Sequence, residues 1–170
     1  MRNTKLIKTY KKIWEKKIPI VSSIFNRENF IKRFLNSIQN QNFQELEIIL
    51  VDDCSKDNSI KIIENFAKKD KRIILIKNKR NKGTFAARNI GILYARGKYI
   101  ILPDADDIIS KNILKYCYNL AEKNKYEIIR FTTYFGHFKL KFQKYDYKLW
   151  NNYKNQPELS TYIFYGYGEL

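Results

Sequence analysis

The stretch "LEIILVDDCSKDNS", residues 46–59, carries the clearest fold signal in the sequence. Its apolar run, 46–51, is short and shows no alternation, which is typical of a strand covered on both faces. The polar residues that follow end this strand. Among them Ser55, Asp57 and Asn58 are candidates for the cap of a helix over 60–67.

The same alternation of strand and helix extends in both directions from this stretch. Strands that alternate with helices about every 25 residues are typical of βαβ units, which build parallel sheets. The sequence therefore predicts an α/β fold, a mostly parallel, Rossmann-like sheet flanked by helices. Further strands are expected over 18–25, 72–77, 98–102 and 126–135, and further helices over 26–41, 85–95 and 113–120.

Three loops follow the predicted strands and should share one edge of the sheet, where parallel sheets bind their ligands. They are 23–27, 52–57 and 104–107, and two of them contain neighbouring acids. Like charges repel, yet these carboxylates are concentrated in two loops of a chain whose net charge is +16. The cluster indicates either a solvated turn or a site for a cation.

Asp104, Asp106 and Asp107 follow the strand expected over 98–102. In an extended segment residues two apart point the same way, so we expect Asp104 and Asp106 to face one hard cation such as Mn²⁺ or Mg²⁺. Mg²⁺ is typically held by one or two carboxylates together with substrate phosphates. An ordinary acidic turn is the alternative, since D-x-D alone is a weak motif.

A second acidic pair, Asp52 and Asp53, ends the strand of the quoted stretch. A carboxylate in this place can accept a hydrogen bond from a base N–H or a ribose hydroxyl. The alternative is a turn acid that caps the next helix, which we expect for one of the two.

The segment 78–89 is basic and has Gly83 just before a predicted helix start, with Arg88 one turn into the helix. Basic residues and a helix N-terminus suit a phosphate group. The segment contains neither a P-loop nor a G-x-G-x-x-G motif, and Gly83 alone also fits a simple turn.

The net charge comes from 33 Lys and Arg against 17 Asp and Glu, an excess that often indicates a nucleic-acid partner. Here Lys outnumbers Arg by 25 to 8 and is spread along the chain. A composition biased toward residues with A- and T-rich codons explains this charge, so we expect no nucleic-acid partner. A basic nucleic-acid-binding domain is kept as the distant alternative.

The cysteine pattern, Cys54 and Cys117 without C-x-x-C, indicates a reducing compartment. His137, the single histidine, is expected to be a surface or strand residue rather than a base. No apolar run approaches the roughly 18 residues of a membrane span, and the N-terminus lacks a signal-peptide core. We therefore expect a cytoplasmic protein or one at the cytoplasmic face of a membrane.

Both ends of the chain differ from its middle. Residues 1–17 are basic, with apolar residues near helical spacing, so they form either a leader segment packed on the domain, a loose leader, or a helix in contact with a membrane surface. Residues 137–150 alternate enough for one or two antiparallel strands, and 151–170 look like the beginning of a helix.

Four stretches in this order resemble the nucleotide-sugar-binding half of the family 2 glycosyltransferases, which have the GT-A fold. The likeness runs from about Ile18 to Lys111. The matching stretches are "FNRENFIKRFLNSIQNQ" (25–41), "LEIILVDDCSKDNS" (46–59), "NKGTFAARNIGILYARGKYI" (81–100) and "LPDADD" (102–107).

The resemblance implies roles for particular residues. Asp53 matches the family's contact to the nucleotide base, and Asp104 and Asp106 match its D-x-D, which holds the metal and the donor diphosphate. Ser23 and Phe25 fall where the backbone packs against the base, although the family usually has proline and tyrosine there. A further match is Arg88, on the "A-R-N" stretch that lines the donor side.

The implied activity is transfer of a sugar from a UDP- or GDP-sugar to an acceptor hydroxyl on a glycan, lipid or protein, with inversion. In inverting members a carboxylate base downstream of the D-x-D deprotonates the acceptor. No acid after Glu127 lies in a motif that matches this base, so it is left unassigned.

The resemblance also divides the chain into a leader (1–17), a nucleotide-sugar-binding α/β domain (18–135) and an incomplete start of the acceptor-side region (136–170). We interpret the chain as truncated. A truncated remnant of the same fold, which binds nucleotide-sugar without catalysis, is the alternative to an active enzyme.

Overall fold

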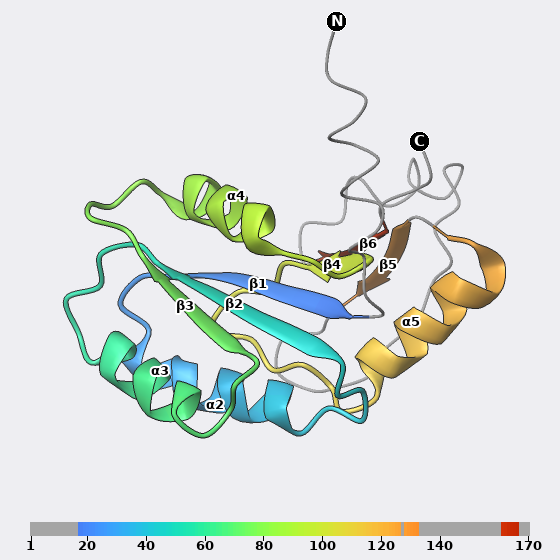
Figure 1. Cartoon of the computed structure of the whole chain (residues 1–170), viewed down its shortest axis with the longest axis horizontal. Helices are drawn as coiled ribbons and strands as arrows, with labels where there is room; N and C mark the ends of the chain where they lie inside the picture. The colour runs from blue at the N-terminus through green and yellow to red at the C-terminus, as the bar shows by residue number, and fades with distance from the viewer. Residues whose placement is uncertain (1–16, 127, 133–160, 167–170) are drawn as a thin grey trace, which may run out of the picture.

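The computed structural model describes residues 17–126, 128–132 and 161–166 of the chain. Nearly every predicted strand and helix within these residues is present, with ends shifted by a few positions (Figure 1). The strands are β1 (Ile18–Ile24), β2 (Leu46–Asp52), β3 (Ile73–Lys77), β4 (Tyr99–Ile101), β5 (Ile128–Thr132) and β6 (Thr161–Gly166). The helices are α2 (Glu28–Gln39), α3 (Ser59–Ala67), α4 (Thr84–Tyr94) and α5 (Ile113–Asn124).

The six strands form one sheet in the order β3-β2-β1-β4-β6-β5. The first four of these are parallel, with Ile20 of β1 aligned to Ile48 of β2 on one side and to Ile101 of β4 on the other. The strand β6 is antiparallel to both β4 and β5. The predicted mostly parallel α/β sheet is therefore confirmed.

The strand β6 corrects one sequence expectation, because its residues were predicted to belong to the beginning of a helix. They pair instead with β4 and β5, so a segment from beyond the predicted α/β domain enters its sheet. The sequence there, "TYIFYG", is rich in the aromatic and β-branched residues that suit a pleated surface. The strands expected over 137–150 and the leader 1–16 lie outside the described residues.

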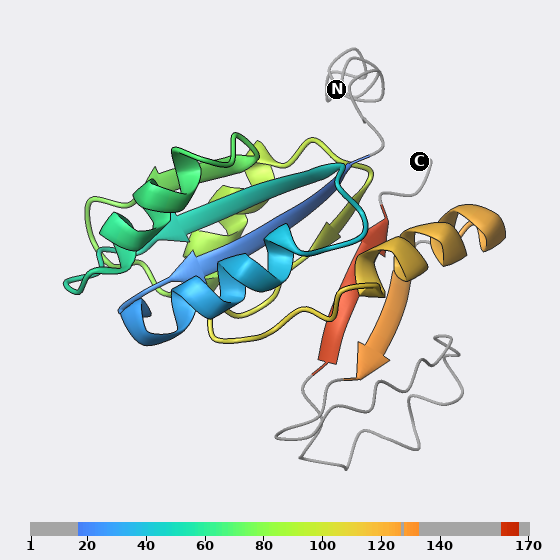
Figure 2. The ribbon, with the colours of Figure 1, turned by 90° about the horizontal axis from the view of Figure 1, so that it is seen from below.

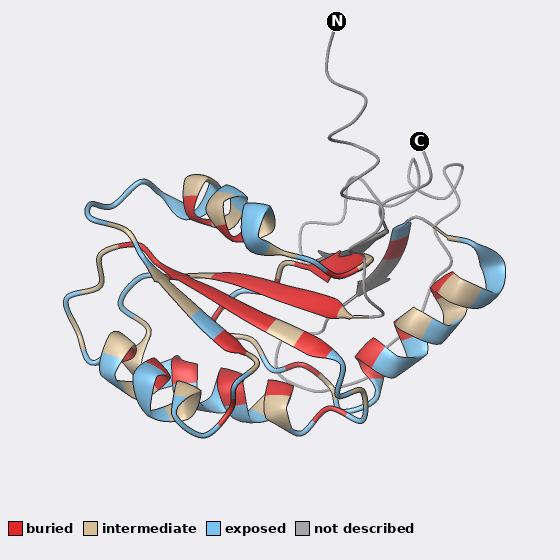
Figure 3. Ribbon diagram, in the orientation of Figure 1, coloured by how far each residue is buried: buried red, intermediate tan, exposed pale blue. Residues whose placement is uncertain are grey.

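Helices cover both faces of the sheet, with α4 on one face and α2, α3 and α5 on the other (Figures 1 and 2). The strands β1 and β2 are buried along almost their whole length, as the apolar run 46–51 predicted (Figure 3). The larger core cluster lies on the side of α2 and α5 and includes Phe34 and Leu114. A smaller cluster lies between the sheet and α4, around Val21 and Ala87.

No helix among the described residues has the length and apolar character that crossing a membrane requires.

An ion-pair network fastens the turn between α3 and β3 to the end of α2. Asp70, 9% exposed, accepts hydrogen bonds from Arg72 Nε at 2.9 Å and Nη2 at 2.8 Å, and from Gln39 Nε2 at 3.1 Å. Arg72 also donates to the Gln44 side chain at 2.7 Å. The hydrogen bond from Arg72 outweighs the desolvation by burial and lowers the pKa of Asp70 to about 2.

This network predicts a specific loss of stability in acid. A carboxylate whose pKa is lower in the folded chain stabilises the fold above its unfolded pKa of 3.8, and this contribution disappears as the pH falls toward 2. We expect the free energy of unfolding to lose about 2 kcal/mol more between pH 5 and 2 in the wild type than in Asp70→Asn. Urea unfolding at several pH values measures this, and parallel curves for the two proteins would contradict it.

Candidate functional site

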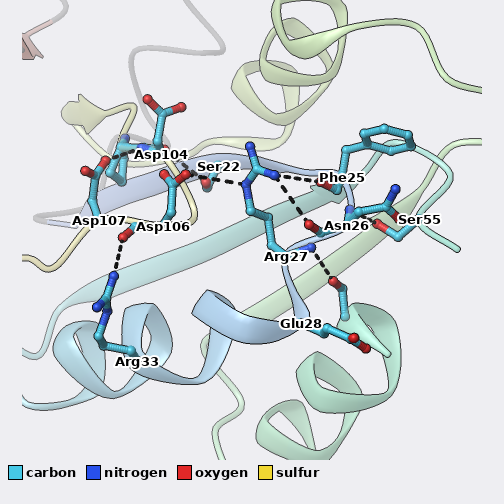
Figure 4. Close-up of polar contacts among 12 residues, drawn as sticks. Ser22, Phe25, Asn26, Arg27, Glu28, Arg33, Ser55, Asp104, Asp106 and Asp107 are labelled. Carbon is cyan, nitrogen blue, oxygen red and sulfur yellow. Dashed lines mark hydrogen bonds and ion pairs between the residues drawn. The ribbon is translucent and has the colours of Figure 1, made fainter. Parts of the chain in front are cut away.

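The candidate site lies at the carboxyl ends of β1 and β4, where the topology of the sheet reverses. After β1 the chain moves outward through β2 and β3, then returns to place β4 on the other side of β1. The loops after β1 and β4 thus leave in different directions, the usual ligand position in open α/β sheets. The buried Ser22 Oγ donates to Pro103 O at 2.9 Å and joins the two strand ends (Figure 4).

The three acids after β4 form a compact turn. Asp107 N donates to Asp104 O at 3.1 Å, and Asp104 N donates to Asp107 Oδ2 at 2.9 Å. The expectation of an extended segment is therefore wrong, because these hydrogen bonds fold the chain back on itself. Carboxylate oxygens of Asp104, Asp106 and Asp107 nevertheless lie within 4.8 Å of one another, a spacing that suits a single hard cation with oxygen ligands.

Burial in the acidic turn changes the titration of Asp107. Burial raises the pKa of Asp107 to about 6, and the negative charges of Asp104 and Asp106 add to the rise. The hydrogen bond from the Asp104 N–H and the positive charge of Arg88 act in the opposite direction. Extra positive charge at this turn is therefore favourable near neutral pH.

Three guanidinium groups approach the acidic turn, from α4, from the loop after β1 and from α2. Arg88 of α4 pairs its Nη2 with Asp104 Oδ1 at 2.6 Å. Arg27, in the loop after β1, places Nε 3.6 Å from Asp106 Oδ2, and Arg33 of α2 donates to Asp106 O at 2.9 Å. The sequence indicated Arg88, but it assigned no role to Arg27 or Arg33. One indication of a role for Arg27 was present in the sequence, because it lies in one of the three loops that were predicted to meet at the edge of the sheet.

The acids after β2 both hold backbone in place. Asp52 accepts hydrogen bonds from the N–H groups of Cys54 and Ser55, so it is a turn acid, although the turn precedes α3 rather than capping it. This turn brings Cys54 to a φ of 72°. Asp53, 2% exposed, accepts from Asn78 Nδ2 at 2.8 Å and from two N–H groups of the loop before α4.

Those two N–H groups belong to Lys82 and Gly83 and lie 2.9 and 2.7 Å from the Asp53 oxygens. Gly83 has a φ of 85°, which only glycine adopts without strain, so the predicted turn is confirmed. With the second contact from Lys82 N, 3.0 Å from Oδ2, each oxygen of the Asp53 carboxylate accepts two hydrogen bonds.

We expect Asp53→Asn to lower the free energy of unfolding by about 1–2 kcal/mol, because the amide NH₂ faces partly buried N–H donors that then lack an acceptor. Urea unfolding measures the effect. Asp57→Asn is not a suitable control because that side chain also accepts backbone N–H groups. Glu64→Gln, on the exposed surface of α3, should leave the stability close to that of the wild type. Equal stability of the two variants would contradict the structural role of Asp53.

The loop after β1 is fastened to the loop after β2. Asn26, with a φ of 52°, donates its N–H to Ser55 Oγ at 3.0 Å and accepts from Lys56 N at 2.8 Å through its side chain. Ser55, one of the three residues predicted to cap the helix, therefore binds the loop after β1 instead. Asn58 likewise donates its side chain to Glu28 Oε2, and Asp57 accepts from Ser59 N at 2.9 Å at the start of α3.

The other predicted site residues lie along the same edge. Ser23 is half-buried in β1 beside Val51, and Phe25, 43% exposed, follows the end of the strand. Predicted residues from β1, β2 and β4 thus occupy three neighbouring strand ends, with Arg88 reaching them from α4. His137 lies outside the described residues.

Comparison with known sequences identifies the family of this chain. The sequence profile of "Glycosyl transferase family 2" matches residues 20–168. The chain belongs to glycosyltransferase family 2. The resemblance drawn from the four stretches is therefore confirmed.

Relatives come from several bacteria. An uncharacterized glycosyltransferase of Haemophilus influenzae is 41% identical over 107 residues, 63% of this chain and 43% of its own length. The poly(ribitol-phosphate) beta-glucosyltransferase of Bacillus spizizenii is 37% identical over 115 residues, 66% of this chain and 18% of its own. This family 2 chain thus matches less than half the length of these relatives.

Solved structures place the sheet in the GT-A fold. Staphylococcus aureus TarS (residues 1–349) in complex with UDP-GlcNAc matches 74% of this chain and 37% of its own, with a TM-score of 0.66 and 27% identity. The Pyrobaculum calidifontis mannosyltransferase PcManGT, in complex with GDP-Man and Mn²⁺, matches 59% of this chain and 33% of its own. Its TM-score is 0.51 at 20% identity, a likeness of fold alone.

Proposed function

We propose that this family 2 chain binds the nucleotide-sugar donor, a UDP- or GDP-sugar, at the carboxyl ends of β1, β2 and β4. The observation that carries the proposal is the acidic turn of Asp104, Asp106 and Asp107 at the reversal of the sheet, with oxygens within 4.8 Å of one another. The similar TarS structure holds UDP-GlcNAc, which supports the class of ligand.

In this proposal Asp104 and Asp106 hold Mn²⁺ or Mg²⁺. When bound, a divalent ion supplies positive charge that stabilises the departing diphosphate. The chain supplies the rest: Arg88 lies 2.6 Å from Asp104 and adds positive charge beside the phosphates, and the N-terminus of α4 follows Gly83.

The base end of the donor is assigned to the first and second strands. In this proposal a base N–H takes the place of the longer Lys82 N contact, 3.0 Å from Asp53 Oδ2. The backbone at Ser23 and Phe25 lies beside it in the sheet, and the exposed Phe25 ring offers an apolar surface to the nucleoside.

A panel of ligands tests this proposal through thermal unfolding. A ligand at 100 times its dissociation constant stabilises a fold by about 2.7 kcal/mol, which raises the midpoint of a domain of this size by about 5 °C or more. We expect such a shift with a UDP- or GDP-sugar plus Mn²⁺, and no shift with AMP or inorganic phosphate plus Mn²⁺. Equal midpoints with every ligand would contradict the proposal.

Transfer to an acceptor is a separate proposal, since the chain spans less than half of its relatives. The second candidate is donor binding without turnover. Release of UDP or GDP from the bound donor, measured with simple sugar acceptors, separates the two: release above the Asp104→Asn/Asp106→Asn background supports transfer, and its absence in a donor-binding chain supports the second candidate.

A further inference from the structure

We propose that Arg27 is a donor-binding residue that pairs with the acidic turn before the metal arrives and binds the donor's diphosphate afterwards. This inference rests on the proposed donor site. It assigns a role to a residue that the motifs left without one.

The position of Arg27 is fixed from its backbone. Its N–H donates to Ser59 Oγ at 2.8 Å, and it directly precedes α2. Its side chain turns back along the strand end, where Nη1 donates to Phe25 O at 3.2 Å and Asn26 O at 3.3 Å. Figure 4 shows the guanidinium between this backbone and the acidic turn, where Nε lies 3.6 Å from Asp106 Oδ2.

Arg27 therefore spans the two parts of the proposed site, from the loop beside the nucleoside to the acids that hold the metal. A nucleotide diphosphate has its phosphates between those same two parts. The Arg27 side chain is 41% exposed, so its remaining N–H donors are accessible to a ligand. A guanidinium is suited to phosphate because its planar fork can donate two parallel hydrogen bonds.

The charges predict an order of events. The three acids carry up to three negative charges, and Arg27 and Arg88 bring two positive charges to Asp106 and Asp104. A divalent cation bound by the same carboxylates repels both guanidiniums and competes for Asp106. The guanidinium of Arg27 is then free to pair with the two negative charges of a nucleotide-sugar diphosphate, so metal and donor strengthen each other's binding.

Replacing Arg27 should consequently change the two affinities in opposite directions. In Arg27→Gln a competitor for Asp106 is removed, so Mn²⁺ alone should bind about three-fold more tightly, as expected for a half-exposed ion pair. At saturating Mn²⁺, UDP should bind at least ten-fold more weakly, because a charge-assisted contact to phosphate is lost. Arg27→Lys keeps the charge and should restore the wild-type Mn²⁺ affinity, with UDP binding between the two.

The matched control is Arg96→Gln, the same exchange on the exposed loop between α4 and β4, at the amino end of that strand. Mn²⁺ binding to the nucleotide-free chain is followed by electron paramagnetic resonance of free Mn²⁺, and UDP binding by calorimetry. Far-ultraviolet circular dichroism and the unfolding midpoint verify the fold of each variant.

The outcomes separate this inference from the proposed function. If the wild type binds Mn²⁺ and UDP while Arg27→Gln behaves like Arg96→Gln, the role of Arg27 is overturned and the donor site stands. Weaker Mn²⁺ binding in Arg27→Gln also overturns it, because a competitor cannot assist the metal. A wild-type chain that binds neither Mn²⁺ nor UDP contradicts the proposed donor site itself.

Discussion

The double variant Asp104→Asn/Asp106→Asn is expected to lose Mn²⁺-dependent UDP binding by at least about 100-fold, as removal of two charged metal ligands implies. Asparagine preserves the shape of both side chains and removes the charge. Asp107 alone then retains a carboxylate in the turn. Calorimetric titration of UDP in the presence of Mn²⁺ measures the loss.

The fold should survive this double exchange. Removing the charges of Asp104 and Asp106 also removes repulsion from Asp107. This gain offsets the loss of the ion pair between Arg88, whose side chain is 20% exposed, and Asp104, whose side chain is 63% exposed. We therefore expect an unfolding midpoint close to that of the wild type. Glu64→Gln, an acid-to-amide change on α3, should bind UDP normally. Retained UDP affinity in the double variant would show that the acidic turn holds no metal for the donor.

Gly91→Val is expected to lower the free energy of unfolding by roughly 3 kcal/mol or more, at the upper end of the cost of overpacking. Gly91 of α4 faces the sheet so closely that a Cβ atom there would meet Val21 Cγ1 at 2.4 Å and Val51 Cγ2 at 3.2 Å. Both valines are fully buried in the core under α4. Since these atoms belong to short, branched side chains in β1 and β2, they cannot move aside without shifting a strand.

The matched control lies two residues further along the same helix, on its exposed side. Leu93→Val also places valine in α4, at a side chain that is 84% exposed, and should change stability by less than about 0.5 kcal/mol. Urea unfolding of both variants measures the difference. If Gly91→Val is as stable as Leu93→Val, the close contact between α4 and the sheet is not as described.

Sequence periodicity predicted most of the fold because buried strands and buried helix faces require apolar residues at regular spacings in the sequence. The apolar run 46–51 became the doubly buried β2, and the apolar stripe of α2 became its buried face, with Ile31, Phe34 and Ile38. The residues 161–166 show no such periodicity, although their aromatic and β-branched composition suits a strand. They form a strand because β4 and β5 lie on either side to pair with them, and pairing across the sheet is a long-range effect that local pattern does not record.

The candidate site was predictable in its location and less so in its contacts. The rule for parallel sheets placed Asp53 and Asp104 on one edge correctly. The turn geometry of 104–107 depends on hydrogen bonds within the loop, which D-x-D spacing does not encode. The approach of Arg33 to Asp106 joins residues 73 positions apart, and only the packing of α2 beneath the sheet brings them together.

The most direct test of the donor site is calorimetric titration of the wild-type chain with UDP, and then GDP, with Mn²⁺ and with EDTA. We predict that one of the two nucleotides binds in the presence of Mn²⁺ and that EDTA abolishes this binding. A folded chain that takes up neither nucleotide with Mn²⁺, or that binds one equally well in EDTA, would contradict it.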